Sequence, residues 1–441
     1  MAIFSLFVLA MMLLMGGVAV DLMRFETYRA RLQATLDRAV LAASDLDVCR
    51  QGAAHASEVV EDYVAKAGFG NEVSEVEIAA SDASCSVAAI AELEVNTIFM
   101  QMVSVDQLST QAFSVAQEIV PQVEISLALD ISSSMSRNLR LDRMIDAANE
   151  FVDVVLTAAA PDTTSINLVP YAGQVNPGPE MFSTLEGARL AQPLIDVLGT
   201  PGDPSDDIPY PNPGSCLEVP GSQMTSVTLP GPGHSQTPYF MVWPFDDTYG
   251  SWGWCPDDAN AVVYASDSIS ELQGRIEDFR LYDGTGTHYA MKWSAALLDP
   301  SSREAMSGLV PPKYSGRPLD PGENVLKVIV LMTDGGISQQ YRPADYFDPL
   351  NLTTVLNARQ EDRVTYVGRG RAQRQFNRIC TQAKNAGIVI FTIAFEAPGS
   401  AFEQMVDCAS SPAHAYNVDG LEIEAAFASI AGQISQLRLV Y

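Results

Sequence analysis

The first twenty residues form one apolar run. From Met1 to Val20 only one serine and two glycines interrupt it, and a helix of about 20 residues crosses about 30 Å of hydrocarbon. We therefore predict an uncleaved transmembrane anchor over residues 1–21. A cleaved signal peptide and a buried core helix are the alternatives, but no basic n-region or small-x-small cleavage site is clear in this segment.

Beyond Asp21 the apolar positions take helical spacing. They recur three and four residues apart at Phe25, Tyr28, Leu32, Leu36, Ala39 and Ala43. This spacing predicts that the helix continues outside the membrane with one apolar face. A helical stretch near residues 57–66 and β-like runs near 73–78, 86–95 and 113–120 then predict that this helix is followed by a small α+β region, the two together covering residues 22–118.

From residue 119 to 441, apolar strands alternate with helices. The predicted strands are 123–129, 165–171, 261–265, 325–332, 388–395 and 414–418. The predicted helices are 138–157, 268–279, 288–298, 372–386, 401–408 and 421–437, the last with Ile423, Phe427, Ile430, Ile434 and Leu437 on one face. This alternation predicts a doubly wound α/β domain with a mostly parallel sheet.

Two insertions interrupt the pattern. Residues 176–259 hold 14 of the 26 prolines and three of the four tryptophans, Trp243, Trp252 and Trp254. A long loop of this kind is functional or cross-linked in a compact domain. The second insertion, 338–371, leads into six arginines, Arg359, Arg363, Arg369, Arg371, Arg374 and Arg378. We expect them to neutralise neighbouring carboxylates, with a docking patch for an acidic partner as the alternative.

Composition excludes two broad classes of protein. The 441 residues include 26 Lys and Arg against 54 Asp and Glu, a formal charge of −28. General nucleic-acid binding by phosphate neutralisation requires the opposite sign on the binding face. Apolar residues make up 47% and charged residues 18%, so the chain has ample material for a core and is not largely disordered.

Six cysteines occur without any C-x-x-C motif. They are spaced as Cys49 and Cys85, Cys216 and Cys255, and Cys380 and Cys408. Isolated cysteines in even number fit disulfides in an oxidising compartment better than zinc or redox motifs. Six cysteines allow 15 connectivities, of which we favour nearest-neighbour pairing, and buried free thiols are the alternative.

Orientation in the membrane is less clear from charge. No Lys or Arg precedes the anchor, whereas Arg24, Arg29 and Arg31 follow it, which reverses the positive-inside pattern. This leaves the true start of the chain open. The cysteines favour an oxidising compartment for the large domain.

Polar motifs follow two of the predicted strands. Asp130-Ile131-Ser132-Ser133-Ser134 ends the first strand, and Thr333-Asp334-Gly335-Gly336 ends the fourth. Each alone is an ordinary helix cap or turn. Ligands of open α/β sheets bind at the carboxyl ends of the strands, so we expect the two loops to meet there and form a site.

A hard cation is the economical explanation for two facing carboxylates. Without it, at least one carboxyl pKa would rise. Carboxylate and hydroxyl oxygens without sulfur or imidazole suit Mg²⁺ or Mn²⁺. Because neutral hydroxyls leave the ion electron-poor, it could accept a carboxylate from another molecule.

An enzyme finds less support. There is no Walker loop, and Gly233-His234-Ser235-Gln236-Thr237 lacks the final glycine of a nucleophile elbow. Only His288 falls near the candidate site, where we expect an exposed residue at a helix start. Metal-assisted hydrolysis stays an alternative, but nothing supplies a positioned acid or base, so we expect no catalysis.

The motif Asp130-x-Ser132-x-Ser134, with Thr333-Asp334-Gly335, resembles the metal-ion-dependent adhesion site of von Willebrand factor A domains. That family adds a threonine from a third loop, here Asp283-Gly284-Thr285-Gly286-Thr287. The resemblance implies metal contacts from Ser132, Ser134 and Thr285, with Thr287 as the fallback. Asp130 and Asp334 would bind directly or through water. The resemblance to von Willebrand factor A domains also implies a disulfide between Cys380 and Cys408.

The N-terminus resembles a second family. Gly17-Val18-Ala19-Val20-Asp21, Leu32-Gln33-Ala34 and the run 37–43 are similar to the anchor of TadE/TadG-like pilus assembly proteins. In TadG-like proteins of the tight-adherence (Flp) pilus system, this anchor precedes an A-type domain. The resemblance implies a membrane-anchored, non-catalytic module whose metal captures an acidic side chain on a pilus or secretion-assembly component. An envelope adhesin that binds surfaces directly is the main alternative.

Overall fold

A computed structural model describes residues 2–70, 72–81, 84–158, 162–196, 207–244, 253–322 and 324–440. The chain divides into two compact units, Met1–Val120 and Pro121–Tyr441. Each unit has its own core, and each is described by itself.

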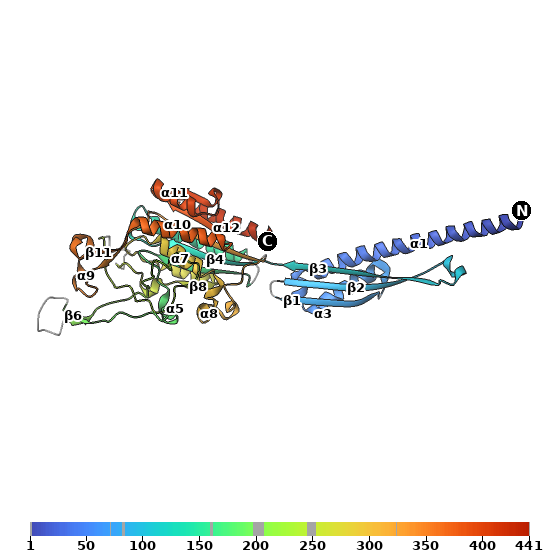
Figure 1. Cartoon of the computed structure of the whole chain (residues 1–441), viewed down its shortest axis with the longest axis horizontal. Coiled ribbons are helices and arrows are strands. Elements are labelled where there is room, and N and C mark those ends of the chain that lie inside the picture. The colour runs from blue at the N-terminus through green and yellow to red at the C-terminus, as the bar shows by residue number, and fades with distance from the viewer. Residues whose placement is uncertain are drawn as a thin grey trace. The chain divides into compact units, whose positions relative to one another are not determined.

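The first unit packs helices against one antiparallel sheet (Figure 1). Its elements are α1 (Ala2–Ala43), α2 (Leu46–Arg50), α3 (Ala53–Val64), β1 (Val73–Ser81), β2 (Ser84–Asn96) and β3 (Gln107–Ile119), with strand order β1-β2-β3. Leu32, Leu36 and Ala39 of α1 are fully buried in the same core as alternate residues of β2, such as Val87 and Ala89. The predicted apolar face of the helix beyond Asp21 therefore packs against one face of this sheet.

Helix α1 is also the candidate membrane span. Among the described residues it alone is long and apolar enough to cross a membrane, by length and composition, with a mean hydropathy of 2.3 in its most apolar window. Its large apolar side chains before residue 20, such as Phe4 and Leu13, are exposed. This half of the helix has the composition of an anchor, and the other half belongs to the core.

The second unit is built on a six-stranded sheet. Its strands are β4 (Gln122–Asp130), β5 (Thr164–Tyr171), β8 (Val263–Ser266), β9 (Val325–Thr333), β12 (Val389–Phe395) and β13 (Ala415–Val418), in the order β13-β12-β9-β4-β5-β8. All neighbouring pairs are parallel except β5 and the edge strand β8. All six predicted strands are present, within two residues at either end.

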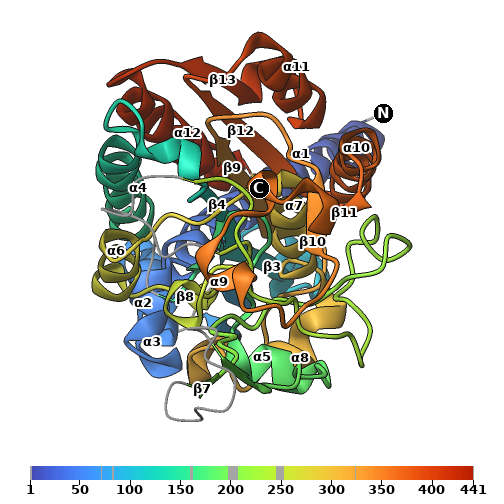
Figure 2. The ribbon, with the colours of Figure 1, turned by 90° about the vertical axis from the view of Figure 1, so that its left-hand side faces the viewer.

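Helices cover both faces of this sheet (Figure 2). On one face lie α4 (Arg140–Thr157), α6 (Ile269–Glu277) and α12 (Glu422–Val440); on the other lie α7 (Thr287–Ala296), α10 (Arg369–Asn385) and α11 (Gly399–Cys408). In α12 the predicted face is buried from Ile423 to Ile434, and Phe427 meets Phe151 edge-on at 5.7 Å. The side chain of Leu437 lies outside the described residues. The doubly wound fold is confirmed.

The insertions fold back onto each other. The first insertion contains α5 (Gly178–Thr184), β6 (Leu194–Asp196) and β7 (Asp207–Pro209), and the second contains β10 (Gln340–Pro343), α9 (Leu350–Thr353) and β11 (Arg363–Val367). Helix α8 (Arg303–Met306) lies outside both, between α7 and β9. Phe240, Val242 and Trp254 of the first insertion share a small core with Tyr341 and Leu356 of the second. Trp252 lies outside the described residues.

Three disulfides join neighbouring cysteines along the chain. They link Cys49 to Cys85, Cys216 to Cys255, and Cys380 to Cys408. The second closes the first insertion, and the third ties α10 to the end of α11. Nearest-neighbour pairing is confirmed, and no described cysteine is free.

Helix α6 gives a local test of the fold. The Ser268 hydroxyl accepts a hydrogen bond from the Glu271 amide at 3.3 Å and caps the helix. We expect Ser268→Ala to lower the unfolding free energy of the second unit by about 1 kcal/mol. Ser268→Thr keeps a capping hydroxyl and should retain most of the wild-type stability. Urea unfolding followed by tryptophan fluorescence measures this, because all four tryptophans belong to this unit. Equal stability of the two variants would contradict the capping role.

Candidate metal centre

Strand β4, the first strand of this sheet along the chain, places Asp130 in the candidate site. Asp130 is the last residue of β4 and is fully buried. One carboxylate oxygen accepts from the Ser132 amide at 2.8 Å, and the other accepts from the Thr333 hydroxyl at 2.7 Å. The aspartate therefore joins the ends of β4 and β9, which are neighbours in the sheet.

Two serine hydroxyls continue the network. A 3-10 turn over Ser133–Ser136 follows β4 and leaves the Ser132 and Ser134 hydroxyls 3.1 Å apart. The Ser134 hydroxyl donates to a carboxylate oxygen of Asp334 at 2.6 Å. The structure thus brings Asp130, Ser132, Ser134 and Asp334 together at the carboxyl end of the sheet.

The third loop lies beside the other two, but its threonines face different surroundings. Tyr282 pairs with Ser132 in a β-bridge, and the Thr285 amide and carbonyl bond to Ser338, in the loop after Asp334. The Thr287 hydroxyl is buried without a hydrogen bond to any described residue. It lies near the phenol of Tyr171, whose strand register places it opposite Asp130. The choice between the two threonines stays open.

Arg140 is a member of the site that the sequence motifs do not reveal. It begins α4 and donates to the second oxygen of Asp334 at 2.7 Å and to Glu396 at 3.0 Å. Glu396 follows β12, the strand next to β9, and also meets Arg143 at 3.4 Å. The position of Glu396 after a predicted parallel strand is a signal that could have found it.

Burial sets the charge state of the two aspartates. Loss of solvent, and next the charge of Asp334, raise the pKa of Asp130 to about 7. Burial also raises the pKa of Asp334, against the opposing hydrogen bonds from Ser134 and Arg140. Ionising both buried carboxyl groups together is costly, and a bound cation would offset that cost.

The available ligand atoms fit a hard cation. They are carboxylate and hydroxyl oxygens, which Mg²⁺ and Mn²⁺ prefer. Among the described residues, no cluster of three or more His, Cys, Asp or Glu side chains could hold a metal by itself. Any metal at this centre would therefore depend on the serine and threonine hydroxyls.

The first insertion supports the threonine loop from outside. The buried Asp283 carboxylate accepts hydrogen bonds from the Val242 and Trp243 amides, and burial raises its pKa to about 6. A Cβ on Gly284 would stand 2.6 Å from the Trp254 ring, and the backbone of Gly284 has a φ of +79°. Only glycine suits this contact, so the insertion forms a wall of the candidate site.

His288 differs from the expectation of an exposed residue. It is completely buried at the start of α7, and neither ring nitrogen has a partner among the described residues. Burial, followed by the positive charge of Arg342, lowers its pKa to about 3. The prediction of an exposed residue was therefore wrong, and the charge of Arg342 from the second insertion acts on the buried ring. A buried neutral imidazole is poorly placed to serve as a base.

The arginine cluster is only partly neutralised. Arg359 pairs with Asp348 and Asp362, and Arg363 lies over the Tyr341 ring. The other four, Arg369, Arg371, Arg374 and Arg378, make no ion pair within the described part of the chain. Three of them line a pocket of about 440 Å³ with Gln375. The expected neutralisation therefore holds for Arg359 and fails for these four.

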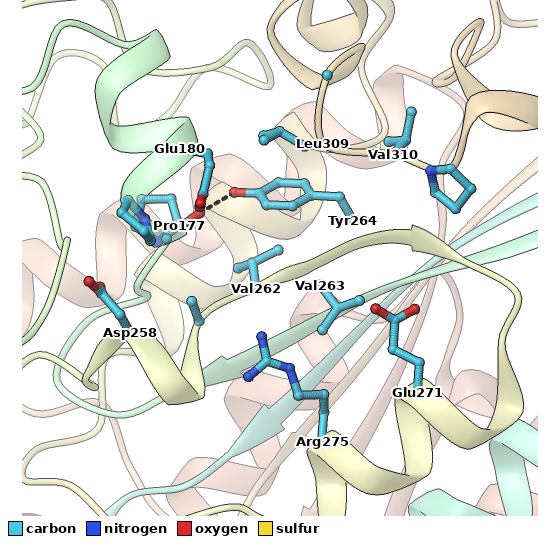
Figure 3. Close-up of a pocket in the computed structure, with 15 residues that line it drawn as sticks. Pro177, Glu180, Asp258, Val262, Val263, Tyr264, Glu271, Arg275, Leu309 and Val310 are labelled. Carbon is cyan, nitrogen blue, oxygen red and sulfur yellow. Dashed lines mark hydrogen bonds between the residues drawn. The ribbon is translucent and has the colours of Figure 1, made fainter.

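A separate pocket of about 600 Å³ lies beside β8 (Figure 3). Its lining includes Glu180, Glu271 and Arg275, and the Tyr264 hydroxyl at its wall donates to the Pro177 carbonyl. None of the residues predicted to bind the metal lines it. This cavity is therefore distinct from the candidate centre.

Comparison with known families concerns first the N-terminus. Residues 1–55 match the family model described as putative Flp pilus-assembly TadE/G-like. The N-terminal segment is a TadE/G-like domain. No curated protein matches the chain.

Solved structures similar to the chain include pilus proteins. The vWF domain of the type V pili tip protein Mfa5 from Porphyromonas gingivalis has a TM-score of 0.39 and 15% identity over 72% of this chain and 97% of its own. The pilus adhesin RrgA from Streptococcus pneumoniae gives 0.35 and 13%, over 82% of this chain and 49% of its own. Proximal thread matrix protein 1 from the mussel byssus, with a zinc-occupied MIDAS motif, gives 0.32 and 12%, over 72% and 46%.

These similarities are low, and the fold itself is the stronger observation. The mostly parallel six-stranded sheet with one antiparallel edge strand, covered by helices on both faces, has the architecture of a von Willebrand factor A domain. The TadE/G-like segment precedes this domain in the chain.

Proposed function

We propose that the chain is a TadG-like protein: a membrane-anchored, metal-dependent binding module that acts in the assembly or anchoring of a Flp/Tad-type pilus. The observation that carries the proposal is the network at the ends of β4 and β9. The Ser132 amide donates to Asp130, the Ser132 hydroxyl lies 3.1 Å from that of Ser134, and the Ser134 hydroxyl donates to Asp334. This network gathers two buried carboxylates and two hydroxyls at the edge of a sheet where ligands bind.

The metal would be Mg²⁺ or Mn²⁺, held by Asp130, Ser132, Ser134, Asp334 and one threonine, Thr285 or Thr287. Such an ion supplies a Lewis-acidic position that can take a carboxylate oxygen from a partner. Within the chain, Thr333 orients the Asp130 carboxylate, and Arg140 donates to the Asp334 oxygen that does not face Ser134. These contacts would hold both carboxylates in place for the ion.

The partner we infer is a pilus or secretion-assembly component that presents an acidic side chain. The TadE/G-like segment supports the pilus context. Three disulfides support an oxidising compartment, which in a bacterium with a single anchor at the inner membrane is the periplasm. We propose no catalysis, because in the described structure the one histidine near the site is buried and neutral.

A membrane pull-down tests the metal-dependent capture. Full-length protein, Asp130→Ala and Ser133→Ala are used as baits with Mg²⁺ or with EDTA. Ser133 lies between the two serines of the network, and its side chain has no part in it. We expect a partner retained only by wild type and Ser133→Ala in Mg²⁺. Equal retention in every lane would remove the metal from the mechanism.

Gene deletion separates assembly from direct adhesion. If the protein acts in assembly, the deletion strain should lose pili and attachment together. If it is an envelope adhesin, pili should still form while attachment falls. Electron microscopy of pili and an attachment assay on the same strains measure both.

A further inference from the structure

The turn between β2 and β3 is bonded to the end of the apolar half of α1. The buried Asp21 carboxylate accepts hydrogen bonds from the backbone amides of Ile98 at 3.0 Å, Phe99 at 2.7 Å and Met100 at 2.8 Å. Three bonds to one carboxylate hold this turn firmly against the helix. Its level along α1 is therefore set by Asp21.

Gly17, one helical turn before Asp21, brings the turn still closer. A Cβ at this position would stand 2.6 Å from the Phe99 side chain, at atoms next to the backbone, which cannot move aside cheaply. The neighbouring Gly16 faces open space. The absence of a side chain at Gly17 lets Phe99 lie against α1 between residues 17 and 21.

The same turn exposes large apolar side chains. Ile98 is 55% exposed, Phe99 40%, Met102 75% and Val103 46%. No charged residue occurs from Thr97 to Val105. An exposed apolar cluster of this kind marks an interaction site. Here it adjoins the exposed apolar surface of α1 before residue 20, because Phe99 lies against Gly17.

We propose that the turn Ile98–Val103, which we call the hairpin tip, is a second membrane contact that inserts into the headgroup and acyl boundary beside the span. The inference rests on α1 crossing the bilayer, as in the proposed function. Because the apolar run ends at Asp21, a spanning α1 places that residue at the interface, and the bonded tip must lie at the same depth. Amphipathic surface segments insert there by about 5–10 Å.

Two attachment points would do what one helix cannot. A single span leaves the first unit free to pivot about the bilayer surface. With the tip also inserted, α1 and the β2–β3 hairpin would fix the tilt of that unit relative to the membrane. Asp21 would be shielded from lipid by the three amides it accepts from.

Depth-dependent quenching tests the tip. The described native cysteines are all in disulfides, so Met102→Cys supplies a single thiol for an environment-sensitive fluorophore. The full chain is reconstituted into phosphatidylcholine and phosphatidylglycerol vesicles that carry nitroxide lipids, shallow or deep. We expect a blue-shifted emission at position 102, quenched at least twofold more by shallow than by deep nitroxides.

Two further labels make the outcomes distinguishable. Leu13→Cys lies within the span and should be quenched most by deep nitroxides, whereas Ala79→Cys is exposed at the far end of the sheet and should not be quenched. An unquenched probe at 102 with a quenched probe at 13 would overturn the tip and leave the anchor. An unquenched probe at 13 would overturn the anchor and, with it, the tip. Disulfide-linked dimers through Cys at 102 without quenching would assign the surface to a second copy.

A matched pair of glycine variants tests the cause. Gly17→Leu should push Phe99 away from α1 and reduce shallow quenching at position 102 at least twofold. Gly16→Leu adds the same apolar surface in open space and should leave the quenching unchanged. Equal behaviour of the two variants would show that the packing on Gly17 does not position the tip.

Discussion

The unfolding temperature of the full-length protein should be roughly 5 °C higher in Mg²⁺ than in EDTA, when Mg²⁺ is present at a hundred times its dissociation constant. A stabilisation of 1 kcal/mol raises the unfolding temperature by about 2–4 °C for domains of 150–250 residues, and by less for larger ones. A ligand that binds only the folded state stabilises it by about 2.7 kcal/mol at that excess. In Asp130→Ala the shift should disappear, because the carboxylate that joins both strand ends is lost. Thermal unfolding followed by tryptophan fluorescence in detergent measures the second unit alone, since it contains every tryptophan.

Ser133→Ala is the control for this experiment. It changes the same turn without removing a ligand atom, and it should show the full wild-type shift. A shift that survives in Asp130→Ala would place the cation elsewhere. Parallel variants Thr285→Val and Thr287→Val then choose between the two threonines, because only the loss of a ligating hydroxyl should reduce the shift.

The second unit was largely predictable because its signals are local. Strands buried on both sides appear as continuous apolar runs, as in Val325–Thr333, and helices such as Arg140–Thr157 carry apolar positions at helical spacing. Because ligand sites of such sheets lie at the carboxyl ends of the strands, the sequence alone also predicts that Asp130 and Asp334 meet. The antiparallel direction of β8 could not be predicted, since a short apolar strand carries no mark of its direction.

What was missed depends on contacts between distant segments. Arg140 belongs to the site because Glu396, 256 residues away, accepts from its guanidinium. His288 is fully buried although its own neighbours are typical of an exposed helix start, and the charge of Arg342, far along the chain, acts on its ring. Strands β10 and β11 pair across a long, poorly periodic segment that contains α9, and Gln340 and Tyr341 of β10 contact Trp254 of the first insertion.

The fold and the candidate centre are linked by the insertions. Asp283 fixes the threonine loop to Val242 and Trp243, and the Cys216–Cys255 disulfide closes the segment that presents them. In compact domains, long loops are uncommon unless they are functional or cross-linked. Here the cross-linked segment contacts the loop that carries the predicted ligands Thr285 and Thr287.

Stability should fall with rising pH in the absence of the cation and should lose most of that dependence at saturating Mg²⁺. In EDTA, Asp130 has a pKa raised to about 7 in the folded state against about 3.9 when unfolded. The folded state therefore holds the extra proton between these values, so stability should fall as the pH rises from about 4 to 7 and then level off. With Mg²⁺, the proton competes with the ion for the carboxylate, so the apparent affinity should fall about tenfold from pH 8 to pH 6.

The difference between the two conditions isolates the two aspartates of the centre, Asp130 and Asp334, from other buried acids. Asp283, whose pKa burial raises to about 6, contributes equally with Mg²⁺ and with EDTA and cancels when one curve is subtracted from the other. The Mg²⁺-induced rise in unfolding temperature should therefore grow from pH 6 to pH 8 in wild type. Asp130→Asn keeps the shape of the side chain but cannot titrate, so it should show neither the growth nor the rise. A rise in wild type that is constant over this range would mean that no proton leaves the centre when the ion binds, and that Asp130 is already ionised there.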